Sequence, residues 1–596
     1  PILSGRPPRD MSTGQDHNYG WGRLTLRLAT GFDATPPQIT IIYPGQGDTV
    51  LTRQPTILAT IEDNKTGVNP ATIVLTLDGV ARTGFTFDPQ TGTLTYAVST
   101  PLSMGVHSVT IVAADQAGNT ASPQTVTFQV QTPSIPSGLQ LISLPYKNVS
   151  NPDPASIFLP PTAGTIRMAR WVPSDNQQNK YHVYPDPWAS LTPPDATGTN
   201  PIVSSPPAGL GYFVLTPGGG VGTTLLNVLG QTVQDVSYTI RLVRGTVYPQ
   251  GWNMIGNPYP APVQWGAVEF VTAGVRQDLT EAIQNGVTEG IIYEFKNTGA
   301  TGYYDFASNP LSAVMQPFKG YWVHVNRDTQ LVVYSPGVST LAVRKRQASL
   351  PSPRWRLRIV AQAGAAYDPT LYIGVGDRCT AGYDPGADIP KPPPVATTLQ
   401  TYMPREHWGE HSGAYAQDIR GRAAGETWDV EVWCEQPHTT VTLTWPDINA
   451  EVPQDVRLVI EDPATNRKVY MRTTSAFSFD SGDGGARRLR ITALDASAEV
   501  LQLSSVQAMA SRGGAVVTFA VTRPAQVSVE VRNISGVLVR RFGEIQAAPG
   551  QTARVVWNGL SASGAPVPAG RYLVCVTARS ADGQVVQGIR SLQIAR

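Results

Sequence analysis

The sequence predicts an all-β protein made of tandem β-sandwich modules in an elongated array. The 596 residues include 56 glycines and 51 prolines, more than the ~7% and ~5% of an average chain, and both residue types disfavour long helices. Short segments of alternating polar and apolar residues recur along the chain and are separated by turn dipeptides such as Asp78-Gly79. At about 100–200 residues per domain, this length accommodates four or five modules.

The charge balance excludes several classes of partner. Charged residues make up 15% of the chain and hydrophobic residues 41%, and the formal net charge is +1. A chain with so little net charge has no strong electrostatic attraction to nucleic acid or to acidic membranes. No apolar stretch approaches the ~20 residues that cross a bilayer. We therefore expect a folded protein without nucleic-acid partners and without membrane insertion.

Residues 1–35 are predicted to form an arm in front of the first module. Strict alternation after Trp21 places Leu24, Leu26 and Leu28 on one face of a strand. Such a strand can add to the open sheet edge of another subunit, and repeated contacts of this kind link copies into a homo-polymer. The alternative is that the arm frays or packs on its own first module.

The arm also carries a stretch of the form Asp-x-x-Tyr-Gly-x-Gly-Arg. The matched positions are Asp16, Tyr19, Gly20, Gly22 and Arg23. The stretch resembles the final segment of the catalytic domain of subtilisin-like serine proteases. Since the nucleophile, histidine and aspartate motifs of that family are missing from this sequence, the resemblance implies the non-catalytic downstream region of a longer precursor.

Residues 36–131 are predicted to form the first module, a β-sandwich with a strand at 72–77. The segments "TGVNPATIVLTLDG" and "GVHSVTIVAADQAGNTA" resemble the bacterial Ig-like domains of secreted and surface proteins. The resemblance implies an extracellular or cell-surface location. Related modules sometimes bind calcium at domain junctions, which makes Glu62, Asp63 and Asp115 candidate ligands; the alternative is that they are solvated loop acids.

Residues 132–337, the repeated domain, contain an internal repeat. "GLQLISLPY" at 138–146 returns as "GWNMIGNPY" at 251–259, and "PPAGLGYFVLT" at 206–216 returns as "MQPFKGYWVHV" at 315–325. Each copy is an aromatic-rich set of strands, so we expect two similar β units that pack together. The pattern is similar to a module in the non-catalytic tails of secreted bacterial proteins.

The aromatic residues of the repeat leave two interpretations open. Trp252 and Trp322 either stack on sugar rings at the surface or pack in the core, and packing is the commoner use of aromatic side chains. One short helix is expected in this domain, at residues 279–284.

Residues 338–499 are predicted to form a third module, again a β-sandwich. Its proline-rich run at 389–394 cannot join a central strand and is expected to form a loop or a polyproline segment. Cys379 and Cys434 fall within this module and would form a disulfide in an oxidising compartment, or each is a small buried hydrophobic residue.

One string in the third module matches a zinc-protease signature, H-x-x-E-H. His407, Glu410 and His411 supply the matching positions. The chemistry requires both histidines on one face of a regular helix, whereas Pro404 precedes the string and Gly409 interrupts it. We interpret the match as a coincidence and predict a protein that is not an enzyme and has no catalytic residues and no metal-binding residues.

Residues 500–596 are predicted to form the C-terminal module. The segment "VVWNGLSASGAPVPAGRYLV" reads as two strands around a tight polar loop. Its W-N-G…V-P-A-G-x-Y motif resembles the Ig-like domain of flagellar hook-capping proteins and the C-terminal sorting domains of surface-delivered bacterial proteins. The resemblance implies an Ig-like fold and leaves the role open.

Together these features predict an extracellular structural protein, a subunit of a surface fibre or filament assembled from independent β modules through its arm. The first alternative is an accessory tail of a secreted subtilisin-like protease, used for anchoring, sorting or substrate binding. The second alternative is a carbohydrate-binding adhesin. No cofactor is expected, apart from the candidate calcium ion in the first module.

Overall fold

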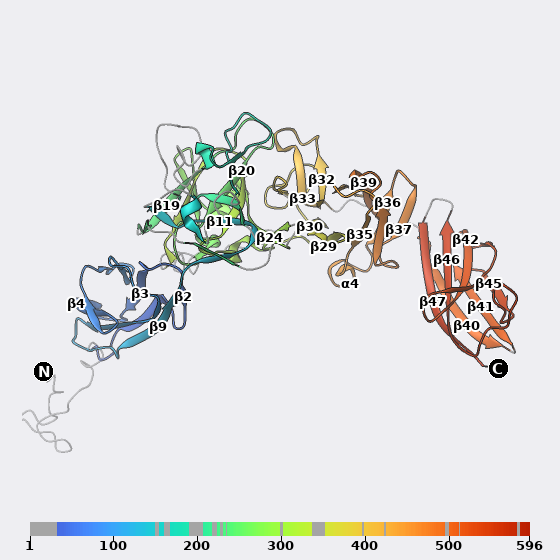
Figure 1. The fold of residues 1–596 in the computed structure, drawn as a ribbon, viewed down its shortest axis with the longest axis horizontal. Coiled ribbons are helices and arrows are strands. Elements are labelled where there is room, and N and C mark those ends of the chain that lie inside the picture. The colour runs from blue at the N-terminus through green and yellow to red at the C-terminus, as the bar shows by residue number, and fades with distance from the viewer. Residues whose placement is uncertain are drawn as a thin grey trace, which may run out of the picture.

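The computed structural model describes residues 33–595. Its description omits these internal segments: 150–153, 160–166, 190–206, 217–222, 227–229, 234, 299–301, 337–351, 396–397, 422–424, 495–499, 512 and 581–583. Strands dominate the described residues, and Ig-like β-sandwiches follow one another in an elongated array (Figure 1). The predicted all-β fold of tandem sandwich modules is therefore confirmed. In the described part of the chain, no helix is long and apolar enough to cross a membrane.

The first module is a two-sheet sandwich. One sheet has the order β1-β3-β7-β6, formed by β1 (Gln38–Tyr43), β3 (Thr56–Glu62), β7 (Thr93–Ala97) and β6 (Thr86–Asp88). The other has the order β2-β9-β8-β4-β5, formed by β2 (Thr49–Val50), β9 (Gln124–Val130), β8 (Gly105–Asp115), β4 (Val68–Leu77) and β5 (Val80–Arg82). Alternate residues of β8, Val109, Ile111 and Ala113, are fully buried between the sheets.

The two copies of the sequence repeat fold alike. The first copy forms the sheet β11-β16-β14-β15, with β11 (Gly138–Ser143), β16 (Gly211–Thr216), β14 (Arg167–Trp171) and β15 (Tyr181–Val183). The second forms the sheet β20-β27-β24-β25, with β20 (Trp252–Gly256), β27 (Gly320–Val325), β24 (Thr288–Asn297) and β25 (Gly302–Phe306). In each copy, the strand that opens the repeat pairs antiparallel with the Gly-aromatic strand that ends it.

Smaller sheets and short helices complete the repeated domain. Its other strands are β10 (Ser134–Pro136), β12 (Tyr146–Val149), β13 (Phe158–Leu159), β17 (Thr223–Leu226), β18 (Gly230–Thr232), β19 (Ser237–Leu242), β21 (Val263–Gln264), β22 (Glu269–Thr272), β23 (Val275–Asp278), β26 (Val314–Met315) and β28 (Thr329–Tyr334). Its helices are α1 (Pro154–Ile157), η2 (Pro187–Ala189), η3 (Trp265–Ala267), α2 (Leu279–Gln284) and η4 (Pro310–Ser312). Helix α2 is the helix expected at 279–284, and a capping box between Asp278 and Glu281 starts it.

The third module surrounds a large core that includes Trp355, Trp428 and Trp445. Its strands are β29 (Trp355–Ala363), β30 (Ala366–Val375), β31 (Ile389–Pro390), β32 (Leu399–Arg405), β33 (Gly413–Arg420), β34 (Thr427–Cys434), β35 (Thr440–Thr444), β36 (Arg457–Asp462), β37 (Arg467–Tyr470), β38 (Ala476–Asp480) and β39 (Gly485–Leu494). Its helices are η5 (Gly409–His411) and α4 (Ile448–Glu451).

The C-terminal module has its own core, and its outer sheet is β40-β41-β45. Its strands are β40 (Leu503–Ser511), β41 (Gly514–Val521), β42 (Ala525–Asn533), β43 (Leu538–Arg541), β44 (Ile545–Ala547), β45 (Thr552–Trp557), β46 (Gly570–Ser580) and β47 (Gln584–Ile594). Strand β37 of the third module pairs in parallel with β47 of this one. A 16-stranded sheet thus runs through both modules. The third and C-terminal modules are therefore joined by backbone pairing, while each keeps its own hydrophobic core.

Candidate functional site

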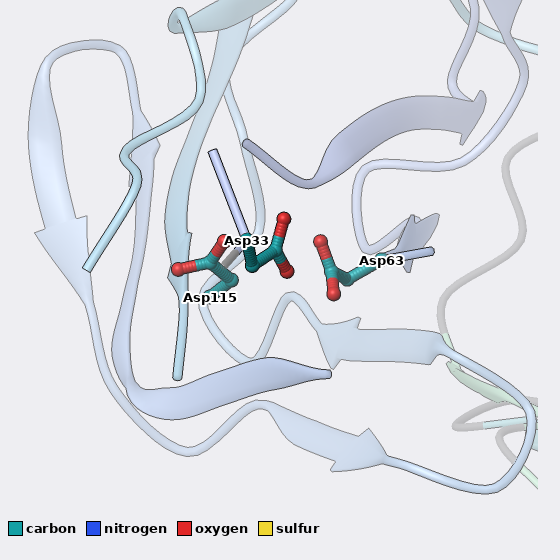
Figure 2. Close-up of side chains that lie close together, drawn as sticks. All are labelled: Asp33, Asp63 and Asp115. Carbon is teal, nitrogen blue, oxygen red and sulfur yellow. The ribbon is translucent and has the colours of Figure 1, made fainter. Parts of the chain in front are cut away.

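Three aspartates meet at one end of the first module. Asp33 lies just before β1, Asp63 directly follows β3, and Asp115 is the last residue of β8 (Figure 2). Each contributes a carboxylate oxygen, and these three oxygens lie within 4.8 Å of one another. Asp33 and Asp115 are only 2% and 1% exposed. The antiparallel pairing of β1 with β3 brings the first two together, because the start of one strand lies beside the end of the other.

Hydrogen bonds hold these carboxylates in place. The Thr66 hydroxyl donates to Asp33 Oδ2 at 2.8 Å. The Asn119 side chain donates to the Asp33 carbonyl at 3.0 Å and to Asp115 Oδ2 at 2.7 Å. Asp63 Oδ2 accepts two backbone N–H groups from the turn that follows it. The site is therefore ordered by its own loops.

The donor set fits a divalent cation such as calcium. Asp63 Oδ1 is buried without a hydrogen-bond partner, although a buried carboxylate oxygen normally has one. Hard cations such as Ca²⁺ prefer carboxylate and carbonyl oxygens. The backbone N–H of Thr35 and the side chain of Thr66 lower the pKa of Asp33, which keeps it in the anionic form that a cation requires. Asp33, Asp63 and Asp115 are the residues that would hold the ion.

Two of the three candidates from the sequence, Asp63 and Asp115, belong to this cluster, whereas Glu62 does not. Glu62 is the residue before Asp63 on an alternating strand, so its side chain points to the other face, and it is exposed. Asp33 was missed because it lies about 30 residues upstream in a stretch without a calcium-loop motif. Asp33 could have been identified from the pairing of β1 with β3, but no local pattern in the sequence indicates which strands pair.

The two tryptophans considered for sugar stacking are interior residues. Trp252 is 4% exposed and Trp322 is 0% exposed. Trp322 makes edge-to-face contacts with Trp171, at 5.3 Å between ring centroids, and with Trp252, at 6.0 Å. The stacking prediction is not supported for either, because rings packed edge to face in a core have no free face for a sugar.

The predicted disulfide between Cys379 and Cys434 is not formed, and both thiols are free. Cys434 ends β34 inside the core, where its thiol donates to the Gln436 carbonyl at 3.6 Å. Cys379 lies in the loop after β30, where burial raises its pKa to about 11. The alternative interpretation, a small buried hydrophobic residue, describes Cys434, whereas Cys379 is only partly buried.

The H-x-x-E-H string does not form a zinc-protease helix. Only Gly409–His411 is helical, as a single 3-10 turn, and Gly409 has a φ of 58°, which ends regular helix geometry. The His411 ring stacks on Tyr383, with 3.9 Å between ring centroids and 14° between ring planes. A histidine engaged in stacking on a turn does not share a helix face with His407.

Ser103, His107 and Asp78 are placed like the serine, histidine and aspartate of a catalytic triad. His107 Nδ1 lies 2.7 Å from Asp78 Oδ2, and His107 Nε2 lies 3.4 Å from the Ser103 hydroxyl. However, Nε2 lies only 3.0 Å from the Ser103 carbonyl oxygen. A ring nitrogen that donates to a carbonyl carries a proton and cannot accept one from the serine. The geometry fits a histidine that ties a loop to the sheet.

The assembly residues Trp21, Leu24, Leu26 and Leu28 lie outside the described residues. Their pairing, in the same chain or with another subunit, stays a prediction.

Comparison with curated proteins finds no match. Among solved structures, the fibronectin(III)-like modules of Clostridium thermocellum CbhA are 17% identical, covering 16% of this chain and 97% of that chain with a TM-score of 0.13. A tetra-tandem repeat from the extending region of a large adhesion protein is 10% identical, covering 94% of this chain and 99% of that chain with a TM-score of 0.14. Sequence identities and TM-scores this low support no inference about the function of this chain.

One match concerns a single module. The profile of the FlgD Ig-like domain family matches residues 504–582, within the C-terminal module. The match confirms that this module is similar to the Ig-like domain of flagellar hook-capping proteins. It leaves the rest of the chain unassigned, and the origin from a subtilisin-like precursor stays a prediction.

Proposed function

We propose that the protein is an extracellular, non-enzymatic structural protein, a subunit of a surface fibre in which tandem β modules supply length and stiffness. The observation that carries this proposal is a series of separate hydrophobic cores along an elongated chain (Figure 1). Modules with their own cores keep their shape without partners. The Ig-like family match supports an extracellular structural or accessory role, since such sandwiches are common in cell-surface proteins.

Contacts at the first junction support stiffness. The Tyr43 hydroxyl of the first module donates to the Pro260 carbonyl of the repeated domain at 3.1 Å. Ala261 packs into the core of the first module, and Leu51 packs against a core of the repeated domain. Because each side contributes an apolar side chain to the other's interior, bending at this junction would expose apolar surface to water.

Calcium at Asp33, Asp63 and Asp115 would stiffen the outer end of the first module. The three residues lie at the ends of different strands, in both sheets of the sandwich. An ion bound by all three would hold the chain before β1 against the rest of the module.

Assembly through the arm is the finer part of the proposal. Trp21, Leu24, Leu26 and Leu28 would add a strand to an open sheet edge of another copy. The C-terminal module offers such an edge in β45, which ends the sheet β40-β41-β45, and Val556 on this strand is 59% exposed. An arm at one end and an acceptor edge at the other make a head-to-tail contact, which produces filaments when it does not close into a ring.

Electron microscopy of the full chain and of a variant without residues 1–30 tests this proposal. We expect filaments from the full chain and single elongated particles from the variant. The substitution Val275→Ala, at an exposed position of the repeated domain, serves as a control and should leave filaments intact. Filaments that form equally well without residues 1–30, or a full chain that stays monomeric at high concentration, would contradict assembly through the arm.

The Asp16–Arg23 stretch favours a second candidate, the accessory tail of a secreted subtilisin-like protease. In that case the modules anchor, sort or bind substrate for an enzyme encoded upstream. An active protease that depends on these modules for surface retention, in the absence of any filament, would favour this candidate over the first.

A further inference from the structure

The repeated domain and the third module share an interface built from aromatic side chains and the proline run. The Tyr293 hydroxyl donates to the Pro390 carbonyl at 2.6 Å, and the Tyr304 hydroxyl donates to the Pro393 carbonyl at 2.9 Å. The Tyr383 hydroxyl of the third module donates to buried Glu289 of the repeated domain at 2.6 Å. These buried hydrogen bonds fix the two units relative to each other, so the surface between them has a defined shape.

A cleft of about 830 Å³ lies beside this interface, and we call it the interdomain cleft. Aromatic side chains from both units line it: Trp171, Tyr181, Tyr248 and Trp252 from the repeated domain, and Tyr402 and His411 from the third module. Tyr248 is 51% exposed although it lies in a concave site. An exposed ring inside a cleft offers a flat apolar platform to a ligand.

The charged groups of the cleft are paired with one another. Arg488 Nε lies 3.1 Å from Glu431 Oε2, and its guanidinium also lies 3.5 Å from Glu406. Arg244 lies 3.6 Å from Glu410. Because these carboxylates are paired with guanidinium groups, the cleft has no strong preference for an anion or a cation. It instead offers donors and acceptors side by side, which suits pairs of neighbouring hydroxyl groups.

Amide side chains extend this polar lining, and a second hollow extends its length. Gln178, Asn179 and Gln250 line the cleft, and the first two are exposed. An adjacent hollow of about 880 Å³ shares Arg244 and His411 with the cleft. Two neighbouring hollows with common lining residues offer room for a ligand of several units rather than a single small molecule.

We propose that the interdomain cleft binds a neutral oligosaccharide. The apolar C–H face of one pyranose ring would stack on Tyr248, and the ring hydroxyls would hydrogen-bond to the paired carboxylate and guanidinium groups. The aromatic platform of this site is Tyr248, and Trp322 is not part of it. The proposal adds a ligand-binding surface to the structural role and does not depend on filament formation.

Isothermal titration of the full chain with cellohexaose, maltohexaose, chitohexaose and xylohexaose tests the proposal. We expect at least one of these hexasaccharides to bind with a Kd below about 1 mM. The substitution Tyr248→Ala should weaken that binding about fivefold, since an aromatic stacking contact is worth about 1 kcal/mol and about 1.4 kcal/mol is tenfold. Glu410→Gln should also weaken it, because the side chain is 69% exposed in the cleft and would lose its charge.

Val275→Ala is the matched control, because Val275 is 58% exposed in the same domain and does not line the cleft. It should bind the hexasaccharide as the wild type does. Circular dichroism of each variant checks that it is folded. Absence of binding to all four probes, binding that survives Tyr248→Ala and Glu410→Gln unchanged, or binding of gelatin peptides in place of saccharides would each overturn the proposal. None of these outcomes bears on filament formation, which electron microscopy tests separately.

Discussion

The third module is joined to its two neighbours in two different ways. Toward the repeated domain, the contact is made by side chains, with the phenols of Tyr293 and Tyr304 hydrogen-bonded to the proline run. Toward the C-terminal module, the contact is made by backbone, with β37 paired in parallel with β47. Beside this pair lies a small apolar cluster of Val459, Tyr470 and Val500.

The difference explains where a binding surface can form. A strand pair makes two sheets continuous and brings their backbones to within ~5 Å, which leaves no hollow between them. Two curved surfaces that touch through side chains at a few points leave concave space beside the contacts, as in the interdomain cleft. The side-chain junction therefore combines rigidity with a site, whereas the backbone junction gives rigidity alone.

The largest expected effect comes from removing a buried ion pair inside the third module, at Lys391, which anchors the proline run that the side-chain junction contacts. Lys391 Nζ lies 2.5 Å from Asp368 Oδ2, and both side chains are 3% exposed. Lys391→Met would leave the Asp368 carboxylate buried without its partner, at a cost of about 3–5 kcal/mol of stability. Urea denaturation measures this loss.

The control for that measurement is an exposed ion pair of the same module. Arg490 lies 2.7 Å from Asp429, and the two side chains are 48% and 51% exposed. Arg490→Met should cost less than about 1 kcal/mol. Equal losses for Lys391→Met and Arg490→Met would contradict the view that burial makes the Lys391 pair important.

The second prediction concerns the candidate calcium site of the first module. There a bound ion would hold the chain before β1 in place, as the β37–β47 pair holds the third and C-terminal modules together. Calcium at 100 times its Kd should stabilise the module by about 2.7 kcal/mol, seen as a higher melting temperature in calorimetry. Asp63→Asn should abolish this increase, whereas Glu62→Gln, next to it but exposed, should retain it. A Glu62→Gln variant that loses the calcium response as completely as Asp63→Asn would argue against the Asp33 cluster.

The third prediction concerns the backbone junction. Tyr470 is 5% exposed and belongs to the small cluster beside the β37–β47 pair. Tyr470→Ala should cost about 2 kcal/mol, and the third and C-terminal modules should then unfold in two separate calorimetric transitions instead of one. A single transition retained in this variant would show that the strand pair alone couples the modules.

The smallest effect is expected at a charge group of the C-terminal module in which the Glu530 side chain is only partly buried, with 14% of its surface exposed. Glu530 lies 2.7 Å from Arg532 and 2.5 Å from Arg541, and its hydrogen bond from Arg532 lowers the pKa of Glu530. A lowered carboxyl pKa stabilises the fold above the unfolded value of about 4.3, and this contribution disappears as the pH falls through the folded value. Glu530→Gln should therefore cost at most about 1 kcal/mol at pH 7 and nothing near pH 2. Urea midpoints at the two pH values test this, and a difference that persists at low pH would refute the assignment.

Local patterns were enough to predict the strands, the repeat and helix α2. The alternation that predicted a strand at 72–77 corresponds to part of β4, and the capping residues Asp278 and Glu281 start α2. These features depend on neighbours within a few residues, so the sequence carries them directly. The same holds for the resemblance of the C-terminal module, whose motif lies within one stretch of chain.

The candidate sites depended on contacts between residues far apart in the chain. Whether Trp322 packs or is exposed is decided by Trp171 and Trp252, which lie on other strands. The place of Asp33 beside Asp63 follows from the pairing of β1 with β3. The chemical type of a side chain determines which ligands it can bind. Its contacts in the folded protein determine whether it is accessible to a ligand.

Local signals in the amino-acid sequence predict a series of β-sandwich modules, because alternation, turn residues and glycine and proline content act over a few residues. The way the modules join, and the place where a ligand can enter, follow from the folded chain. The pairing of β37 with β47 and the cleft beside Tyr248 arise from surfaces contributed by different modules. Complementarity between distant surfaces is a property of the folded chain, since no local pattern encodes it.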